Sequence, residues 1–192
     1  MRKLFTSVVV VLTITWAVGL AAFVPTAQAV SLSSGDLIKG SLPAVYYYGA
    51  DAKRYVFPDV KTYETWYGSD FSSVKTITDE ELATIPIGGN VTYRPGESMI
   101  KIQSDPKVYA VSQNGTLHWV STESVASCLY GSDWASNIND VSDAFFVNYT
   151  VGSEITDCAD YDPDAAKAAS STINVDKGLA EGAAGDITAS LA

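Results

Sequence analysis

Histidine and cysteine are scarce in this chain, and common catalytic motifs are missing. The 192 residues include one histidine, His118, and two cysteines, Cys128 and Cys158. The sequence holds no His/Cys cluster for zinc, no glycine-rich phosphate loop and no G-x-S-x-G turn. We therefore expect no metal and no cofactor. We interpret His118, whose counterpart in the repeat described below is Tyr55, as a structural residue.

Positive charge is also in short supply. Lysine and arginine number 12 against 22 aspartate and glutamate residues, which gives a net charge of −10. An acidic surface repels nucleic acid and anionic lipid headgroups. Neither nucleic acid nor a membrane surface is an expected partner.

Long apolar runs are absent except at the N-terminus. Two basic residues there precede an uncharged, mostly apolar stretch over 4–24, and Pro25 and an Ala-Gln-Ala sequence follow where a signal peptidase would cut. We predict a signal peptide over 1–29 and a protein that is secreted or held at the cell surface. The alternative is an uncleaved anchor, since the run is long enough to span a bilayer. Cleavage would leave 10 basic and 22 acidic residues, a net charge of −12.

Five residues occur twice with one change. YGSDF begins at Tyr67 and YGSDW begins at Tyr130, 63 positions later. The same shift aligns PAVYYYGADAKRYVF with PKVYAVSQNGTLHWV, and a shift of 64 aligns VKTITDEELATIPIGG with INDVSDAFFVNYTVGS. Apolar positions persist while polar ones change, as expected of two units that share a fold. We predict tandem repeats over 30–98 and 99–156.

Each predicted unit has the pattern of a small α+β fold. Strands are expected at 37–40, 45–48 and 54–57, and again at 99–103, 108–111 and 117–120, with a turn between the last two of each set. A helix should then begin at Asp59, or at Ser121 or Thr122, and end at Gly68 or Gly131. Thr78-x-x-Glu81 resembles a capping box for a second helix. We expect a β-hairpin or small antiparallel sheet with two short helices in each unit.

The repeated pentapeptide fits a structural role. Its tyrosine would pack, its glycine would end the helix, and its serine and aspartate would satisfy the turn. The final aromatic residue, Phe71 or Trp134, would return to the core. Asp70 and Asp133 as paired carboxylates or calcium ligands are the alternative.

The composition changes after residue 156. Residues 157–192 are rich in alanine, aspartate, glycine and serine, with few large apolar side chains, which predicts a flexible acidic tail. Asp160, Asp162 and Asp164 alternate like the start of a calcium loop, but the glycine and the closing glutamate of that loop are missing. A solvated acidic segment is the preferred interpretation.

Two further features concern covalent chemistry. Export permits a disulfide between Cys128 and Cys158, which would fix the start of the tail to the helix of the second unit. Two free thiols are the alternative. Asn90, Asn114 and Asn148 begin glycosylation sequons, and the turn explains Asn114 better.

Tyr47 is the aromatic residue that the repeat explains least. Its neighbours in the strand align with core-compatible residues of the second unit, whereas Tyr47 aligns with Ala110 and points to the opposite side of the strand. Exposed aromatic rings offer contact area to sugars and peptides. The hypothesis is a ligand-binding surface formed by Tyr47 and Tyr55, and packing between the two repeats is the alternative.

The stretches AVYYYGADAKRYVFPDVKTYETWY and ATIPIGGNVTYRP resemble a repeated extracellular module of bacterial secreted and envelope proteins. The resemblance covers roughly residues 36–155 and implies an extracellular module without an established catalytic role. KVYAVSQNGTLHWV is also similar to one blade of a quinoprotein-type β-propeller, although two units and a helical segment do not fit a propeller.

These observations favour a non-enzymatic module of the cell envelope or the secreted fraction. It would act as a spacer, an assembly unit or an adhesive, wall-binding domain, with cell-wall glycan or another envelope protein as its partner. The alternative is a carbohydrate-active hydrolase that uses a pair of aspartate or glutamate residues. No such pair stands out by its spacing.

Overall fold

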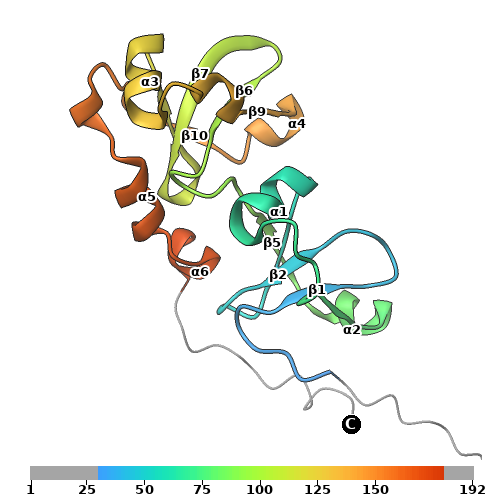
Figure 1. Cartoon of the computed structure of the whole chain (residues 1–192). Coiled ribbons are helices and arrows are strands. Elements are labelled where there is room, and N and C mark those ends of the chain that lie inside the picture. The colour runs from blue at the N-terminus through green and yellow to red at the C-terminus, as the bar shows by residue number, and fades with distance from the viewer. Residues whose placement is uncertain (1–29, 180–192) are drawn as a thin grey trace, which may run out of the picture.

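A computed structural model describes residues 30–179. The predicted signal peptide and residues 180–192 lie outside this range. The described chain is an α+β structure with two five-stranded mixed sheets and several short helices, and Figure 1 shows one sheet in the upper part and one in the lower part. In the part that is described, no helix is long and apolar enough to cross a membrane.

The first sheet has the strand order β4-β1-β2-β3-β5. Its strands are β1 (Leu37–Lys39), β2 (Tyr46–Tyr48), β3 (Arg54–Val56), β4 (Lys75–Thr76) and β5 (Ile87–Asn90). β1, β2 and β3 pair antiparallel, as the sequence predicts. β4 and β5 add to the two edges in parallel orientation. Sequence reasoning missed both, because strands of two and four residues give little alternation to detect.

The second sheet has the strand order β9-β6-β7-β8-β10. Its strands are β6 (Met99–Ile102), β7 (Asp105–Ser112), β8 (Thr116–Trp119), β9 (Ile138–Val141) and β10 (Thr150–Val151). The three central strands are again antiparallel and the two edge strands parallel. The predicted antiparallel strands are thus present in both sheets, but the parallel edge strands make each sheet mixed.

The helices begin and end at residues that the sequence marks. They are α1 (Val60–Tyr67), α2 (Asp79–Thr84), α3 (Glu123–Tyr130) and α4 (Asp143–Phe146), with a 3-10 turn over Trp134–Asn137. Asp59 caps α1, Thr122 caps α3, and Thr78 and Glu81 form the predicted capping box of α2. Gly68 ends α1 with a φ of 65°, a conformation that other residues avoid.

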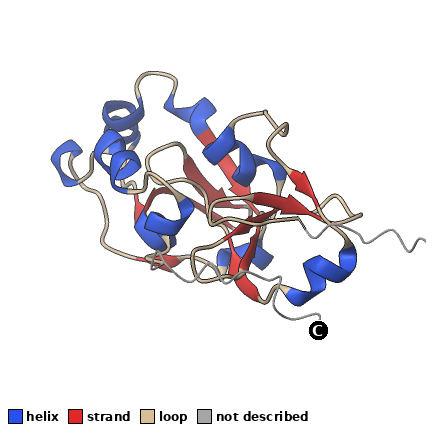
Figure 2. Cartoon of the chain, turned by 90° about the horizontal axis from the view of Figure 1, so that it is seen from below, coloured by secondary structure: helices blue, strands red, loops and turns tan. Residues whose placement is uncertain are grey.

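Apolar clusters cover both faces of each sheet. On one face of the first sheet, Tyr48 packs with Ile77 and Ile85 at the two ends of α2, and on the other face Tyr47 packs with Tyr63 of α1. The second sheet is covered in the same way by α4 and α3. Seen from below in Figure 2, the strands lie centrally and the helices surround them. A strand in such a sheet is apolar on both sides.

The prediction of a flexible tail is wrong for residues 157–179. A 3-10 turn (Cys158–Asp160), α5 (Pro163–Ala169) and α6 (Ile173–Asp176) form there and extend along one side of both sheets (Figure 1). Asp157, Asp162 and Thr172 cap these helices. The composition is low in apolar residues, but three of them enter clusters of the sheets: Tyr161, Ile173 and Leu179. These three anchors supply the burial that composition does not reveal.

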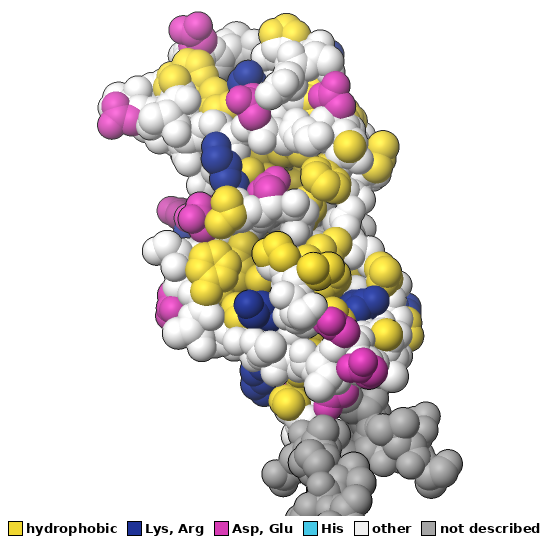
Figure 3. Space-filling view, turned by 90° about the vertical axis from the view of Figure 1, so that its right-hand side faces the viewer, with side chains coloured by type: hydrophobic (Ala, Val, Ile, Leu, Met, Phe, Trp, Pro, Cys, Tyr) yellow, Lys and Arg dark blue, Asp and Glu magenta, His cyan; other side chains and the backbone are white. Residues whose placement is uncertain are grey.

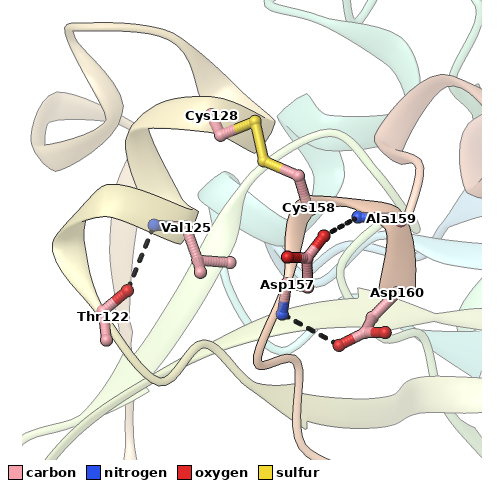
Figure 4. Close-up of a disulfide and its surroundings, with 7 residues drawn as sticks. All are labelled: Thr122, Val125, Cys128, Asp157, Cys158, Ala159 and Asp160. Carbon is pink, nitrogen blue, oxygen red and sulfur yellow. Dashed lines mark hydrogen bonds between the residues drawn. A yellow bond between two sulfur atoms is a disulfide. The ribbon is translucent and has the colours of Figure 1, made fainter.

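Cys128 of α3 and Cys158 form a disulfide, the pairing that the sequence predicts (Figure 4). Their Cα atoms are 6.2 Å apart, within the usual range for a disulfide. Thr65 of α1 lies 63 positions before Cys128, and its Oγ1 accepts a hydrogen bond from the Arg94 amide at 3.1 Å. Both contacts join the last turns of a helix, α1 or α3, to the chain that follows the last strand of the corresponding sheet.

We expect the disulfide to contribute roughly 3–4 kcal/mol, because it closes a loop with a sequence separation of 30. Reduction should therefore lower the melting temperature of the oxidised protein. The Cys128→Ser/Cys158→Ser variant should show the same loss and should no longer respond to reductant. Two alkylatable thiols in unreduced protein would contradict this prediction.

Candidate binding grooves

The hypothesis of a surface formed by Tyr47 and Tyr55 is wrong. The two side chains are only 2% and 5% exposed, respectively, and they pair across β2 and β3. Their rings belong to the cluster with Tyr63 and Ile173. Tyr47 points to the opposite face of the sheet from Tyr46 and Tyr48, as predicted. However, α1 and α6 cover the face to which Tyr47 points. Neither ring is available to a ligand.

A different pair of sites lies where each hairpin meets the start of the following helix. The first, groove 1, has a volume of about 510 Å³ and opens beside the loop between β1 and β2. It is lined by Pro43, Ala44, Val45, Val56, Phe57, Pro58, Asp59, Val60, Tyr63, Phe71 and Phe145. Figure 3 shows hydrophobic side chains gathered across the middle of the face that carries this loop and α4.

The second, groove 2, has a volume of about 250 Å³ and lies on the second sheet. It is lined by Pro106, Val108, Trp119, Val120, Ser121, Thr122, Glu123, Ala126 and Trp134. Each of these nine residues is 63 positions after a residue that lines groove 1. The two grooves therefore occupy the same place relative to two separate sheets. Only Ala44 and Phe145 of groove 1 have no counterpart in groove 2.

The last residue of the repeated pentapeptide lines each groove. Phe71 stacks on Tyr63 with ring centroids 4.2 Å apart and remains 43% exposed, and Trp134 is half-buried. The prediction that these aromatic rings return to the core is therefore wrong for Phe71. The rest of the pentapeptide has the expected structural roles: Gly68 ends α1, and Asp70 accepts a hydrogen bond from the Ser72 amide at 2.8 Å. This bond also lowers the pKa of Asp70.

The two grooves differ in chemistry. Groove 1 is almost entirely apolar, and its one carboxylate, Asp59, already accepts the Thr62 amide at 2.7 Å. Groove 2 combines two indole rings with the polar side chains of Ser121, Thr122 and Glu123. The ammonium group of Lys107 lies 4.8 Å from the centroid of Trp119. Groove 2 thus offers flat apolar surfaces beside hydrogen-bonding groups.

A signal for the grooves was present in the sequence. The shift of 63 aligns two Pro-x-Val sequences, at Pro43 and Pro106, which line the grooves together with the pentapeptide aromatics. In a repeat, retained apolar residues are usually interpreted as core, and function is expected among the residues that differ. Here the retained apolar residues line a partly open surface, so the retained residues, and not the differing ones, mark the candidate sites.

His118 and Asp160 serve the scaffold. The ring of His118 contacts the backbone oxygen of Ser153 at 2.8 Å, and Asp160 accepts hydrogen bonds from the amides of Thr156 and Asp157. Within residues 30–179, no group of three His, Cys, Asp or Glu side chains is placed to hold a metal ion.

Comparison with known proteins gives no relatives for these sites. No family model, no curated protein sequence and no solved structure matches the chain.

Proposed function

We propose that this chain is an exported, non-enzymatic binding module made of two copies of one unit, and that it attaches to neutral glycan. Unit 1 covers residues 30–98 and unit 2 covers 99–156. The observation that carries the proposal is the pair of grooves at equivalent positions. Folding alone does not require an open groove lined by aromatic rings beside each sheet. Two such grooves at equivalent positions are expected if each unit carries the same binding site.

Strand pairing supports the duplication. Tyr46 pairs with Val56 in the first sheet, and the residues 63 positions later, Tyr109 and Trp119, pair in the second. At the outer edge, Arg54 pairs with Ile87, and Leu117 pairs with Val151 at shifts of 63 and 64. The order of helices between the strands is also the same.

The chemistry of groove 2 favours a sugar. The faces of a pyranose ring carry C–H groups that pack on an indole ring, while its hydroxyl groups need donors and acceptors at the side. Trp119 and Trp134 supply the indole rings. The hydrogen-bonding groups are those of Ser121, Thr122 and Glu123. With 22 acidic and 12 basic residues, the chain repels anionic polymers, so an uncharged glycan is the better partner. The N-terminal signal would deliver the module to the cell surface, where such polymers are found.

Replacing Trp134 by alanine should weaken retention on a purified neutral polysaccharide by at least about tenfold, because an aromatic anchor in a binding groove contributes more than about 1.4 kcal/mol. Co-sedimentation with the insoluble polymer measures this. Val147→Ser changes a residue that is 83% exposed and lines neither groove, and it should bind as the wild type does.

Two outcomes would count against the proposal. Equal retention of Trp134→Ala and the wild type would show that groove 2 does not bind the polymer. Release of reducing sugar by the wild type, abolished by one aspartate or glutamate substitution, would instead favour the hydrolase. The melting temperature of each variant shows whether a loss of binding reflects unfolding.

A further inference from the structure

Groove 1 is a composite site, in contrast to groove 2. Phe145 belongs to α4, which covers the second sheet, yet it lines groove 1 together with residues of the first sheet and of α1. All nine residues that line groove 2 come from unit 2 alone. The shape of groove 1 therefore depends on how the two units are placed relative to each other. The shape of groove 2 does not depend on that placement.

Residues 161–179 contact the hairpin turns of both units. In unit 1, the Asn174 side chain accepts a hydrogen bond from the Ala50 amide at 3.0 Å and donates one to the Ser34 hydroxyl at 2.8 Å. Ile173 is fully buried in the cluster of Tyr47. These contacts fix one end of α6 to the turn between β2 and β3.

The other end of α6 contacts the corresponding turn of unit 2. Asp176 is 1% exposed, and its Oδ1 atom accepts a hydrogen bond from the Asn114 amide at 3.0 Å. The Gln113 side chain donates to the Val175 carbonyl at 2.7 Å. Burial raises the pKa of the Asp176 carboxyl, with Lys177 acting in the opposite direction. A buried carboxylate that binds a turn amide constrains both groups.

The preceding helix, α5, lies against the linker, residues 91–98 at the end of unit 1, which join the first sheet to the second. Lys167 forms an ion pair with Glu97. Gly96 adopts a φ of 71° and lies so close to the Pro163 carbonyl that a side chain would not fit. The segment therefore contacts unit 2, the linker and unit 1 in turn.

We propose that residues 161–179 form a clasp that holds the two units in the arrangement that completes groove 1. Asn174 and Asp176 are its positioning residues, since each binds a hairpin turn of a different unit. The clasp itself is independent of the proposed function. Only its effect on glycan binding rests on that function.

Fluorine NMR on exported protein labelled with 4-fluorophenylalanine tests the clasp without a ligand. Among the residues that the structure describes, Phe57, Phe71 and Phe145 line groove 1, and Phe146 packs in the second core. In Asn174→Ala/Asp176→Ala, we expect shifted or broadened resonances for Phe71 and Phe145 and an unchanged resonance for Phe146. A second sample labelled with 5-fluorotryptophan should show Trp119 and Trp134 of groove 2 unchanged.

Matched variants separate positioning from a general loss of structure. Asp176→Asn keeps an acceptor oxygen for the Asn114 amide and should retain the wild-type spectrum, as should Ser171→Ala, which changes an exposed residue of the same segment. Unchanged Phe71 and Phe145 resonances in the double variant would overturn the clasp. Movement of Phe146, Trp119 and Trp134 as well would also overturn it, because the segment would then support the whole fold.

Calorimetric titration with a soluble fragment of the retained glycan adds a binding readout. The wild type should bind the fragment at groove 2, and Asn174→Ala/Asp176→Ala should bind it with the same affinity, because groove 2 is lined by unit 2 alone. Absence of binding to the wild type would contradict the proposed function and leave the NMR result as the test of the clasp. Weaker binding by the double variant than by the wild type would show that the segment also supports groove 2 and would contradict the clasp.

Discussion

Replacing Tyr47 by alanine is expected to lower the free energy of unfolding by about 3–5 kcal/mol, the range for removing a large buried aromatic side chain. The ring is 2% exposed and packs between the first sheet and the helices α1 and α6. Its removal leaves a cavity that rigid strands cannot close. Denaturant titration at neutral pH measures the loss.

Tyr46→Ala is the matched control for this experiment. Tyr46 is the preceding residue of β2, is half-buried, and has the Arg54 guanidinium 5.1 Å from its ring centroid. Its loss should cost clearly less than the loss of Tyr47. If Tyr47→Ala kept the wild-type stability and lost attachment to wall material, the Tyr47 ring would contact the ligand and would not be a core residue.

Ile173→Ala should lower the free energy of unfolding by about 2–5 kcal/mol, although Ile173 lies in a segment whose composition resembles a disordered tail. The side chain is fully buried in the cluster of Tyr47 and Tyr63. Because Ile173 packs in the core of the first sheet, α6 should unfold together with that sheet. The loss of stability should therefore appear as a lower midpoint of one cooperative transition. Thermal unfolding followed by circular dichroism would show it.

Val175→Ala provides the comparison within the same helix. Val175 is 41% exposed, so its truncation should change the melting temperature little. Equal and small effects of Ile173→Ala and Val175→Ala would mean that α6 does not dock on the first sheet. That result would restore the interpretation of residues 157–179 as a flexible tail.

Local sequence signals predicted the local structure well. Asp59, Thr78 and Gly68 act at helix ends as their residue types indicate, because capping depends on a few adjacent atoms. The antiparallel centre of each sheet follows from three short strands separated by turns. The parallel edge strands could not be found in the same way, since their partners lie about 30 residues or more away in the sequence.

Side-chain exposure was harder to predict than backbone structure. Alternation correctly placed Tyr47 on the opposite side of the strand from its neighbours, but alternation identifies a surface only when one face of a sheet is open. The docking of Ile173 closes that face from a segment 126 residues later. The grooves could not be predicted for a related reason. A retained Pro-x-Val sequence is equally compatible with a core and with the wall of an open site.

The disulfide also has a mechanical consequence. Tension applied to the C-terminal end of the chain would pass from Cys158 through sulfur directly to α3, so the residues between Cys128 and Cys158 would carry no load. These residues form β9, α4 and β10 and would otherwise extend by roughly 100 Å at about 3.3 Å per residue. The contact between Thr65 and Arg94 beside the first sheet is only a hydrogen bond and should break under a much smaller force. The segment between the two cysteines, with β9, α4 and β10, is thus protected against stretching from the C-terminal side.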